Sequence, residues 1–202
     1  MTDTQRQELW LQLLVNISKF VDKRVTKTGE HSENVAKWAS TTARELKMSE
    51  EEVKGVFWAS ILHDIGKIVI SDRILRKKEA LSDADWVLIK MHPSVGSDIV
   101  SSINSMPMLA PTISAHQEKF DGTGYPNGLS GKNIPLSARI LGIADAYQAM
   151  IEDRYYRQAR SHEEAVNELQ KVKGTQFDPE VLDVFLNVVN SGTVARNSLN
   201  SS

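Results

Sequence analysis

The chain has 202 residues, of which 41% are hydrophobic and 25% charged, and its formal net charge is −2. These values are typical of a soluble one-domain protein and argue against a broadly basic nucleic-acid binder, while the absence of cysteine excludes disulfides, thiolate metal sites and a cysteine nucleophile. Because the sequence has neither an apolar run long enough to span a membrane nor a signal-peptide pattern, we expect a cytoplasmic protein.

Helical periodicity dominates the first half of the chain. Apolar residues recur at helical spacing over 5–21 and again over 33–48. Ser49 and Glu52 form a capping-box pattern that predicts the start of a helix running to residue 63. Ser82 and Asp85 repeat this pattern, and the helix that they open should end near Pro93.

The second half contains one long loop between further helices. A short helix is expected over 93–104. Residues 121–135 hold four glycines and two prolines, which predicts a structured loop. Helical periodicity returns over 138–151, 161–172 and 178–189. The sequence therefore predicts an all-α fold with an N-terminal amphipathic helix (1–26), one domain (27–190) and a disordered tail (191–202).

The N-terminal helix has two interpretations. Its apolar stripe either packs on the helix's own domain or forms a dimerisation or linker surface. The chain is accordingly either a stand-alone protein or a fragment of a longer one, and a homodimer is expected.

Histidines and carboxylates form the candidate chemical centre. Four of the five histidines, His31, His63, His92 and His116, fall near expected helix ends or loop junctions. A single histidine is more often a surface or core residue than a ligand. However, Asp64 and Asp145 stand in apolar runs, where an ionised carboxylate is costly to bury unless it is paired or binds a cation. Imidazole and carboxylate together suit Mn, Fe, Zn or Ni.

Several motifs occur in an order that resembles a known family. They are LHDIGK, HQEKFDGTGYP, RILGIADAYQAM and RYYR. Together they resemble the HD-GYP family of the HD superfamily of metal-dependent phosphohydrolases, over about residues 29–188. The resemblance implies a compact helical domain with a GYP loop and bacterial signalling. It also implies hydrolysis of cyclic di-GMP to pGpG or GMP.

The resemblance also implies a site with two divalent transition metal ions, Fe, Mn or similar. One ion would be held by four residues and the other by three, with one aspartate shared and a hydroxide between the ions as nucleophile. The first set is His31, His63, Asp64 and Asp145, and the second is Asp64, His92 and His116.

Catalytic and substrate-binding roles follow from the same resemblance. Asp64 and Lys67 would be catalytic, with Lys67 facing the substrate phosphate or holding the nucleophilic water. Arg154 and Arg157 would grip phosphates or guanine edges, and Tyr125 would shape the pocket. The alternatives are a solvated basic turn for the arginines and a loop-packing aromatic for the tyrosine. Arg139 is expected to be a structural salt-bridge partner.

The sequence departs from the family pattern at three positions. Gln117 stands where the family usually has a second histidine, so the second metal should bind weakly, or take water or Glu118 instead. Lys27 replaces a glutamate of three-metal members, which predicts no third metal and pGpG as product. Gln148 replaces a common aspartate, removing a charge and a proton relay.

Three functions remain open from the sequence. The first is a metal-dependent phosphodiesterase acting on cyclic di-GMP. The second is a catalytically weak or inactive module that binds cyclic di-GMP or a GGDEF-type partner protein. The third is a phosphodiesterase for another substrate, such as 3′,3′-cGAMP or a nucleotide monophosphate. Neither DNA nor a membrane is expected as a partner.

Overall fold

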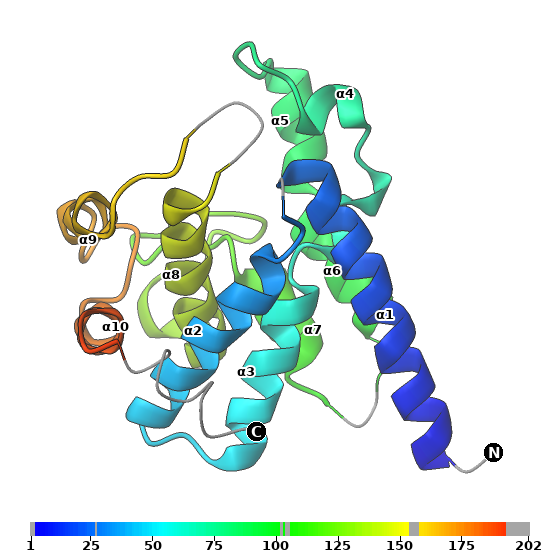
Figure 1. Cartoon of the computed structure of the whole chain (residues 1–202), viewed down its shortest axis with the longest axis horizontal. Coiled ribbons are helices and arrows are strands. Elements are labelled where there is room, and N and C mark those ends of the chain that lie inside the picture. Colours follow the sequence, from blue (N-terminus) through cyan, green and yellow to red (C-terminus); the bar gives the residue numbers. More distant parts are fainter. Residues whose placement is uncertain (1–2, 27, 102, 104–105, 154–157, 193–202) are drawn as a thin grey trace.

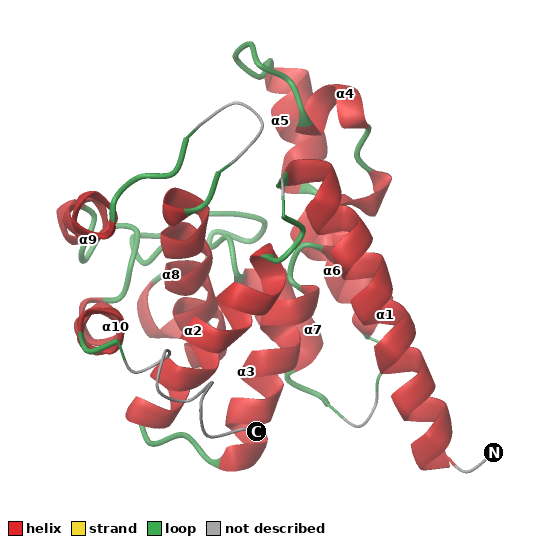
Figure 2. Ribbon diagram, in the orientation of Figure 1, coloured by secondary structure: helices red, strands yellow, loops and turns green. Residues whose placement is uncertain are grey.

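A computed structural model describes residues 3–26, 28–101, 103, 106–153 and 158–192. No β-strand occurs in this part of the chain, and its regular structure is helical (Figure 2). The predicted all-α fold is therefore confirmed. No helix among the described residues is long and apolar enough to cross a bilayer.

Ten α-helices and two short 3₁₀ helices follow one another along the described residues. The first six elements are α1 (Asp3–Val25), α2 (His31–Glu45), α3 (Glu50–Leu62), η1 (Ile65–Val69), α4 (Asp72–Leu75) and α5 (Asp83–Lys90). The remaining elements are α6 (His92–Val100), α7 (Leu109–Ala115), η2 (Gly131–Asn133), α8 (Leu136–Ile151), α9 (His162–Lys171) and α10 (Pro179–Asn190).

The helix starts that the sequence predicts are confirmed where a cap defines them. Ser49 and Ser82 each accept a hydrogen bond from the third residue of the helix that they open, and both capping boxes are complete. The sequence did not predict η1, α4 or α7. Each has seven residues or fewer, which is too short to display an apolar period.

One hydrophobic core lies among α2, α3, α7, α8 and α10 (Figure 1). Leu62, Ile113, Ile140, Leu141 and Phe185 are fully buried there. Burying one such side chain stabilises the fold by about 1.5–3 kcal/mol, so this core holds the central helices in register. The rigid helices then fix the positions of the residues at their ends.

Helix α1 lies along the edge of the molecule, with its N-terminal end away from the core (Figure 1). Its inner face is buried at Leu14 and Val21, which favours packing on its own domain. Its outer face leaves Leu9, Leu13 and Phe20 exposed. The homodimer and the domain division at residue 26 stay predictions. The predicted tail lies outside the described residues from position 193 onward.

Candidate metal centre

Four helix ends bring the predicted histidines together. His31 and His92 are the first residues of α2 and α6, while His63 and His116 directly follow α3 and α7. Each of these histidines is at most 2% exposed. The prediction that they stand at helix ends is confirmed, and all four rings lie inside the protein.

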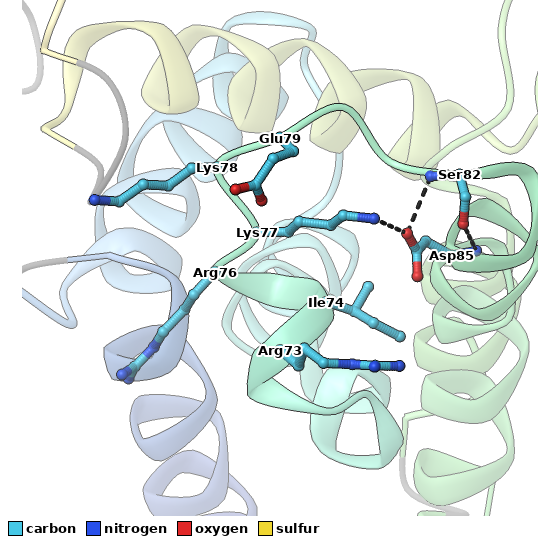
Figure 3. A pocket seen from close by; sticks show the side chains of 8 residues that line it. All are labelled: Arg73, Ile74, Arg76, Lys77, Lys78, Glu79, Ser82 and Asp85. Carbon is cyan, nitrogen blue, oxygen red and sulfur yellow. Dashed lines mark hydrogen bonds and ion pairs between the residues drawn. The ribbon is translucent and has the colours of Figure 1, made fainter.

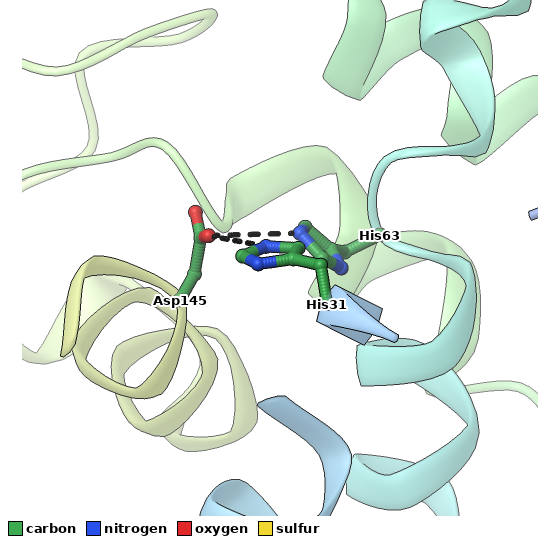
Figure 4. A group of neighbouring side chains, drawn as sticks. All are labelled: His31, His63 and Asp145. Carbon is green, nitrogen blue, oxygen red and sulfur yellow. Dashed lines mark hydrogen bonds and ion pairs between the residues drawn. The ribbon is translucent and has the colours of Figure 1, made fainter. Parts of the chain in front are cut away.

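The first group of candidate ligands consists of His31, His63 and Asp145. Figure 4 shows Asp145 reaching from α8 towards both imidazole rings. Its Oδ1 lies 3.1 Å from Nε2 of His31 and 3.8 Å from Nε2 of His63. One ligand atom from each residue lies within 4.8 Å of the others, a spacing that could hold one metal ion.

The second group, Asp64, His92 and His116, lies beside the first. Nε2 of His92 lies 3.6 Å from Oδ1 of Asp64 and 3.2 Å from Nε2 of His116. The other oxygen of Asp64, Oδ2, lies 3.4 Å from Nε2 of His63 in the first group. Asp64 therefore has one carboxylate oxygen towards each group.

Backbone carbonyls orient three of the rings. Nδ1 of His63, His92 and His116 lies 2.6–2.7 Å from the carbonyl oxygen of the residue three positions earlier. A carbonyl only accepts hydrogen bonds, so each Nδ1 carries the proton that it donates, and Nε2 is the nitrogen left for a metal ion. This arrangement is typical of metal-binding histidines, whose second nitrogen is held by a backbone or carboxylate oxygen.

Two buried atoms on the ligand side of the centre have no hydrogen-bond partner within the part of the chain that the structure describes. They are Nε2 of His63 and Oδ1 of Asp64. Leaving a buried polar atom unsatisfied costs about 1–3 kcal/mol, and native proteins rarely tolerate it without a reason. A cation between the two groups would satisfy both atoms, and their chemistry fits a divalent transition metal.

Burial and neighbouring charges keep the second group in the protonation state that a metal requires. Burial lowers the pKa of His92 to about 4 and that of His116 to about 3, with further lowering by neighbouring positive charge. Burial also opposes ionisation of Asp64, but His63 and Lys67 outweigh it and hold the pKa of that carboxyl well below its usual value. The group therefore combines neutral imidazoles with an ionised carboxylate.

His31 has a second carboxylate partner that the sequence analysis missed. Its Nδ1 lies 2.7 Å from Oε1 of Glu152. Burial lowers the pKa of His31, but hydrogen bonds to Asp145 and Glu152 outweigh it and raise the pKa to about 10. A metal ion would therefore bind Nε2 by displacing its proton. Glu152 follows Asp145 by seven residues, two helical turns along the same face, and this spacing was the available signal.

Gln148 supports Glu152. Its Nε2 donates to Oε2 of Glu152 at 3.3 Å, and its Oε1 accepts from Nε1 of Trp38 at 3.2 Å. We expected Gln148 to remove a charge near the site. In the structure, Glu152 supplies a carboxylate one turn further along the chain.

Lys67 lies beside the shared carboxylate. Its Nζ is 2.6 Å from Oδ2 of Asp64, and its side chain is 18% exposed. The preceding Gly66 allows η1 to touch α6, because a Cβ there would lie only 2.0 Å from the carbonyl oxygen of His92. This close approach of the two backbones brings Asp64 next to His92.

Gln117 and Tyr125 form a polar bridge to the first group. The Tyr125 hydroxyl donates to Oε1 of Gln117 at 3.2 Å, and Nε2 of Gln117 donates to Oδ2 of Asp145 at 3.4 Å. Burial raises the pKa of Tyr125, so its phenol stays protonated as a donor. Tyr125 precedes Pro126 through a cis peptide bond.

Glu118 holds the GYP loop. Its two carboxylate oxygens accept hydrogen bonds from the backbone N–H groups of Asn127 and Leu129 at 2.7 and 3.1 Å. Gly124 packs against the same segment, where a Cβ would lie 2.3 Å from the backbone nitrogen of Lys119. These contacts give no support to Glu118 as a replacement metal ligand.

Three further sequence expectations have different outcomes. Arg139 forms an ion pair with the buried Asp178, which confirms the structural role expected for it. Arg154 and Arg157 lie outside the described residues, and so does Lys27.

Two cavities adjoin the centre and share Trp86. The first has a volume of about 670 Å³ and is lined by Gln117 and Tyr125, together with Lys90. The second, of about 580 Å³, is lined by Lys67. Trp86 lines both cavities and is 44% exposed.

A third cavity, of about 550 Å³, shares lining residues with the second in the segment after α4 (Figure 3). Lys77 and Lys78 line both of these cavities, and Arg73 and Arg76 line the third. Figure 3 shows Lys77 reaching Asp85, with Nζ and Oδ2 2.6 Å apart. The surface leading to Lys67 is therefore rich in basic side chains.

Comparison with known proteins gives one family. The profile described as HD domain matches residues 14–181. A cyclic di-GMP phosphodiesterase of Thermotoga maritima is 36% identical over 186 residues, covering 91% of this chain and 50% of the relative. A 3′3′-cGAMP-specific phosphodiesterase of Vibrio cholerae is 36% identical over 177 residues, covering 87% of this chain and 34% of the relative. The chain thus spans half or less of the length of these two relatives.

A solved structure shares the fold. It is a cyclic GMP-AMP-specific phosphodiesterase of V. cholerae (V-cGAP3), which superposes with a TM-score of 0.70 at 21% identity, covering 92% of this chain and 50% of that chain. The family match, the helical fold and the HD and GYP motifs agree with one another. The chain belongs to the HD-domain family, in its HD-GYP group.

Proposed function

We propose that the chain is a metal-dependent phosphodiesterase whose substrate is cyclic di-GMP. The observation that carries this proposal is the pair of buried ligand groups joined by Asp64, with ligand atoms left unsatisfied. The names of relatives such as the T. maritima and Xanthomonas campestris cyclic di-GMP phosphodiesterases support the substrate.

We assign two divalent ions to the centre, of Fe, Mn or a similar metal. The ligands of the first are His31, His63, Asp64 and Asp145, and those of the second are Asp64, His92 and His116. When bound, such a pair supplies Lewis acidity at phosphorus and water of lowered pKa at neutral pH. Asp64, with one oxygen towards each group, sets the spacing between the two sites.

Lys67 is the proposed catalytic cation. Its Nζ contacts Asp64 and its side chain is partly open to the second cavity, so it can touch both the centre and a substrate phosphate. A lysine ammonium in this position binds a phosphate oxygen and stabilises negative charge that develops on it. Lys77 and Lys78 extend the positive charge along the same cavity.

Trp86 supports a ligand with two bases. A cyclic dinucleotide has two nucleobases, and Trp86 lines both cavities, so its ring can contact a base in either one. Aromatic side chains bind bases by stacking, which contributes about 1–3 kcal/mol per base. Tyr125, in the wall of the first cavity, adds a hydroxyl and an aromatic edge.

Gln117 makes the second ion the weaker of the two. As a glutamine it offers no imidazole to Asp64, His92 and His116, and its side chain is engaged by Tyr125 and Asp145. From Lys27, which replaces the glutamate of three-metal members, we propose limited hydrolysis with pGpG as the main product. A GGDEF-type partner and a homodimer remain proposals from the sequence.

A second substrate has specific support. Relatives of V. cholerae at 30–36% identity carry the name 3′3′-cGAMP-specific phosphodiesterase. Lysine contacts to phosphate do not distinguish bases, so the choice between guanine and adenine depends on the two cavity walls.

Turnover assays test this proposal. The chain, purified without oxygen or chelators, is incubated with Mn²⁺ or Fe²⁺ and either cyclic di-GMP or 3′,3′-cGAMP, and the products are separated by chromatography. We expect pGpG from cyclic di-GMP, and no product from Asp64→Ala. Faster hydrolysis of 3′,3′-cGAMP than of cyclic di-GMP would make 3′,3′-cGAMP the preferred substrate. If both substrates stay intact although metal is bound, the proposed phosphodiesterase activity is refuted, and a module that binds cyclic dinucleotides is favoured.

A further inference from the structure

Three residues of α1 contact the segments that carry His31, His63 and Asp64. The Ser18 hydroxyl donates to the carbonyl oxygen of Ile61, two residues before His63, at 2.5 Å. Asp22, four residues after Ser18, and Arg24, six residues after Ser18, reach the other two segments. None of these three α1 residues belongs to the proposed ligand sets.

Asp22 holds the start of α2. Its Oδ2 accepts from the backbone N–H of Ser32 at 2.9 Å, and its Oδ1 accepts from the Ser32 hydroxyl at 3.0 Å. Ser32 directly follows His31, and Glu30, the residue before the helix, makes no side-chain cap. Asp22 therefore caps α2 from a different helix, with its negative charge at the positive end of the helix dipole.

The contact between Asp22 and Ser32 is buried, which makes it costly to break. Asp22 is 3% exposed, and both of its oxygens are used on Ser32. Burial raises the pKa of Asp22, while nearby His31 and the Ser32 N–H oppose the rise. A buried carboxylate with two short hydrogen bonds holds its partner in one geometry, because any displacement leaves polar groups unpaired.

Arg24 holds η1 in a similar way. Its Nη1 donates to the carbonyl oxygen of Lys67 at 3.2 Å, its Nη2 donates to that of Ile70, and its Nε pairs with Asp72 at 2.7 Å. Asp64 is the residue immediately before η1. Arg24 thus fixes the turn that carries both Asp64 and Lys67.

We propose that α1 positions the metal ligands, with Asp22 as the positioning residue for His31. This inference rests on the proposed metal centre. Loss of Asp22 leaves every ligand present but lets the first turn of α2 move. The affinity of the site that contains His31 then falls. Supporting groups behind metal ligands typically contribute 10–100-fold in metal affinity.

Direct metal titration tests the inference without substrate. Binding of Mn²⁺ is measured by calorimetry for the wild-type chain, Asp22→Ala and Asp22→Asn. The matched control is Lys19→Ala, which breaks the exposed Lys19–Glu33 ion pair between the same two helices, at 2.7 Å. We expect Asp22→Ala to weaken the tighter site by about 10-fold or more and Lys19→Ala to change it less than twofold.

A second readout separates positioning from general stability. Ser32→Ala removes only the bond to Oδ1 and retains the backbone bond, so it serves if Asp22→Ala does not fold. Its affinity should lie between those of wild type and Asp22→Ala. These variants could instead lower the melting temperature while the folded proteins still bind Mn²⁺ with wild-type affinity. That result would contradict the positioning role of Asp22. If the wild-type chain binds Mn²⁺ but does not hydrolyse the substrate, only the proposed enzymatic activity is refuted, and the positioning inference stands.

Discussion

Gly66→Ala tests whether the contact between η1 and α6 builds the second ligand group. The new Cβ would lie 2.0 Å from the carbonyl oxygen of His92 and 2.6 Å from the backbone nitrogen of Gly96. Ordinary contact requires about 3.4 Å. The two backbones must therefore separate by more than an ångström, and neither is a flexible side chain that can turn away.

This separation should affect metal binding more than it affects the fold. Asp64 and His92 are 3.6 Å apart and lie on the two segments that would move. We expect an overpacking cost of about 1–3 kcal/mol in the free energy of unfolding, together with loss of the weaker Mn²⁺ site. Denaturant unfolding measures the first quantity and calorimetric titration the second.

Gly55→Ala is the matched control. The nearest atoms to a Cβ there belong to the flexible side chain of Met108, which can move aside. Alanine is also the better helix former by about 1 kcal/mol. Two Mn²⁺ sites should remain in Gly55→Ala. If Gly66→Ala also binds two ions with wild-type affinity, the close approach does not build the site.

Three further predictions concern the centre and its cavities. Lys67→Ala should retain both metal ions and lower kcat by roughly 10²–10³-fold, and an unchanged rate would remove Lys67 from the catalytic group. Gln117→His should tighten the weaker Mn²⁺ site and raise turnover at limiting metal, whereas unchanged metal content would exclude residue 117 from the ligand shell. Trp86→Ala should raise KM for cyclic di-GMP by roughly 5–150-fold through lost stacking while Trp86→Phe stays near wild type, and equal KM values for all three proteins would contradict the assignment.

The sequence predicts the fold well where local signals are strong. Complete capping boxes mark the starts of α3 and α5, and an apolar stripe marks α8. It fails at α7, although that helix delivers His116, because seven residues do not display a period. Here the core packing of Leu109 and Ile113 decides the conformation.

The candidate ligands could be predicted because their motifs are local, but their supports could not. Asp22 and Ser32 are ten residues apart, and Arg24 reaches carbonyls more than forty residues away. Such contacts depend on how helices pack and leave no periodic trace in the sequence. The same holds for Gln117, which joins Tyr125 to Asp145 across the site.

The central claim is that Asp64 joins two metal sites, and a crystal structure of the Mn²⁺-loaded chain tests it most directly. Anomalous scattering should give two peaks, each about 2.2 Å from one oxygen of Asp64. One peak should lie among His31, His63 and Asp145, and the other beside His92 and His116. A single peak, or two peaks that Asp64 does not contact, would contradict the account.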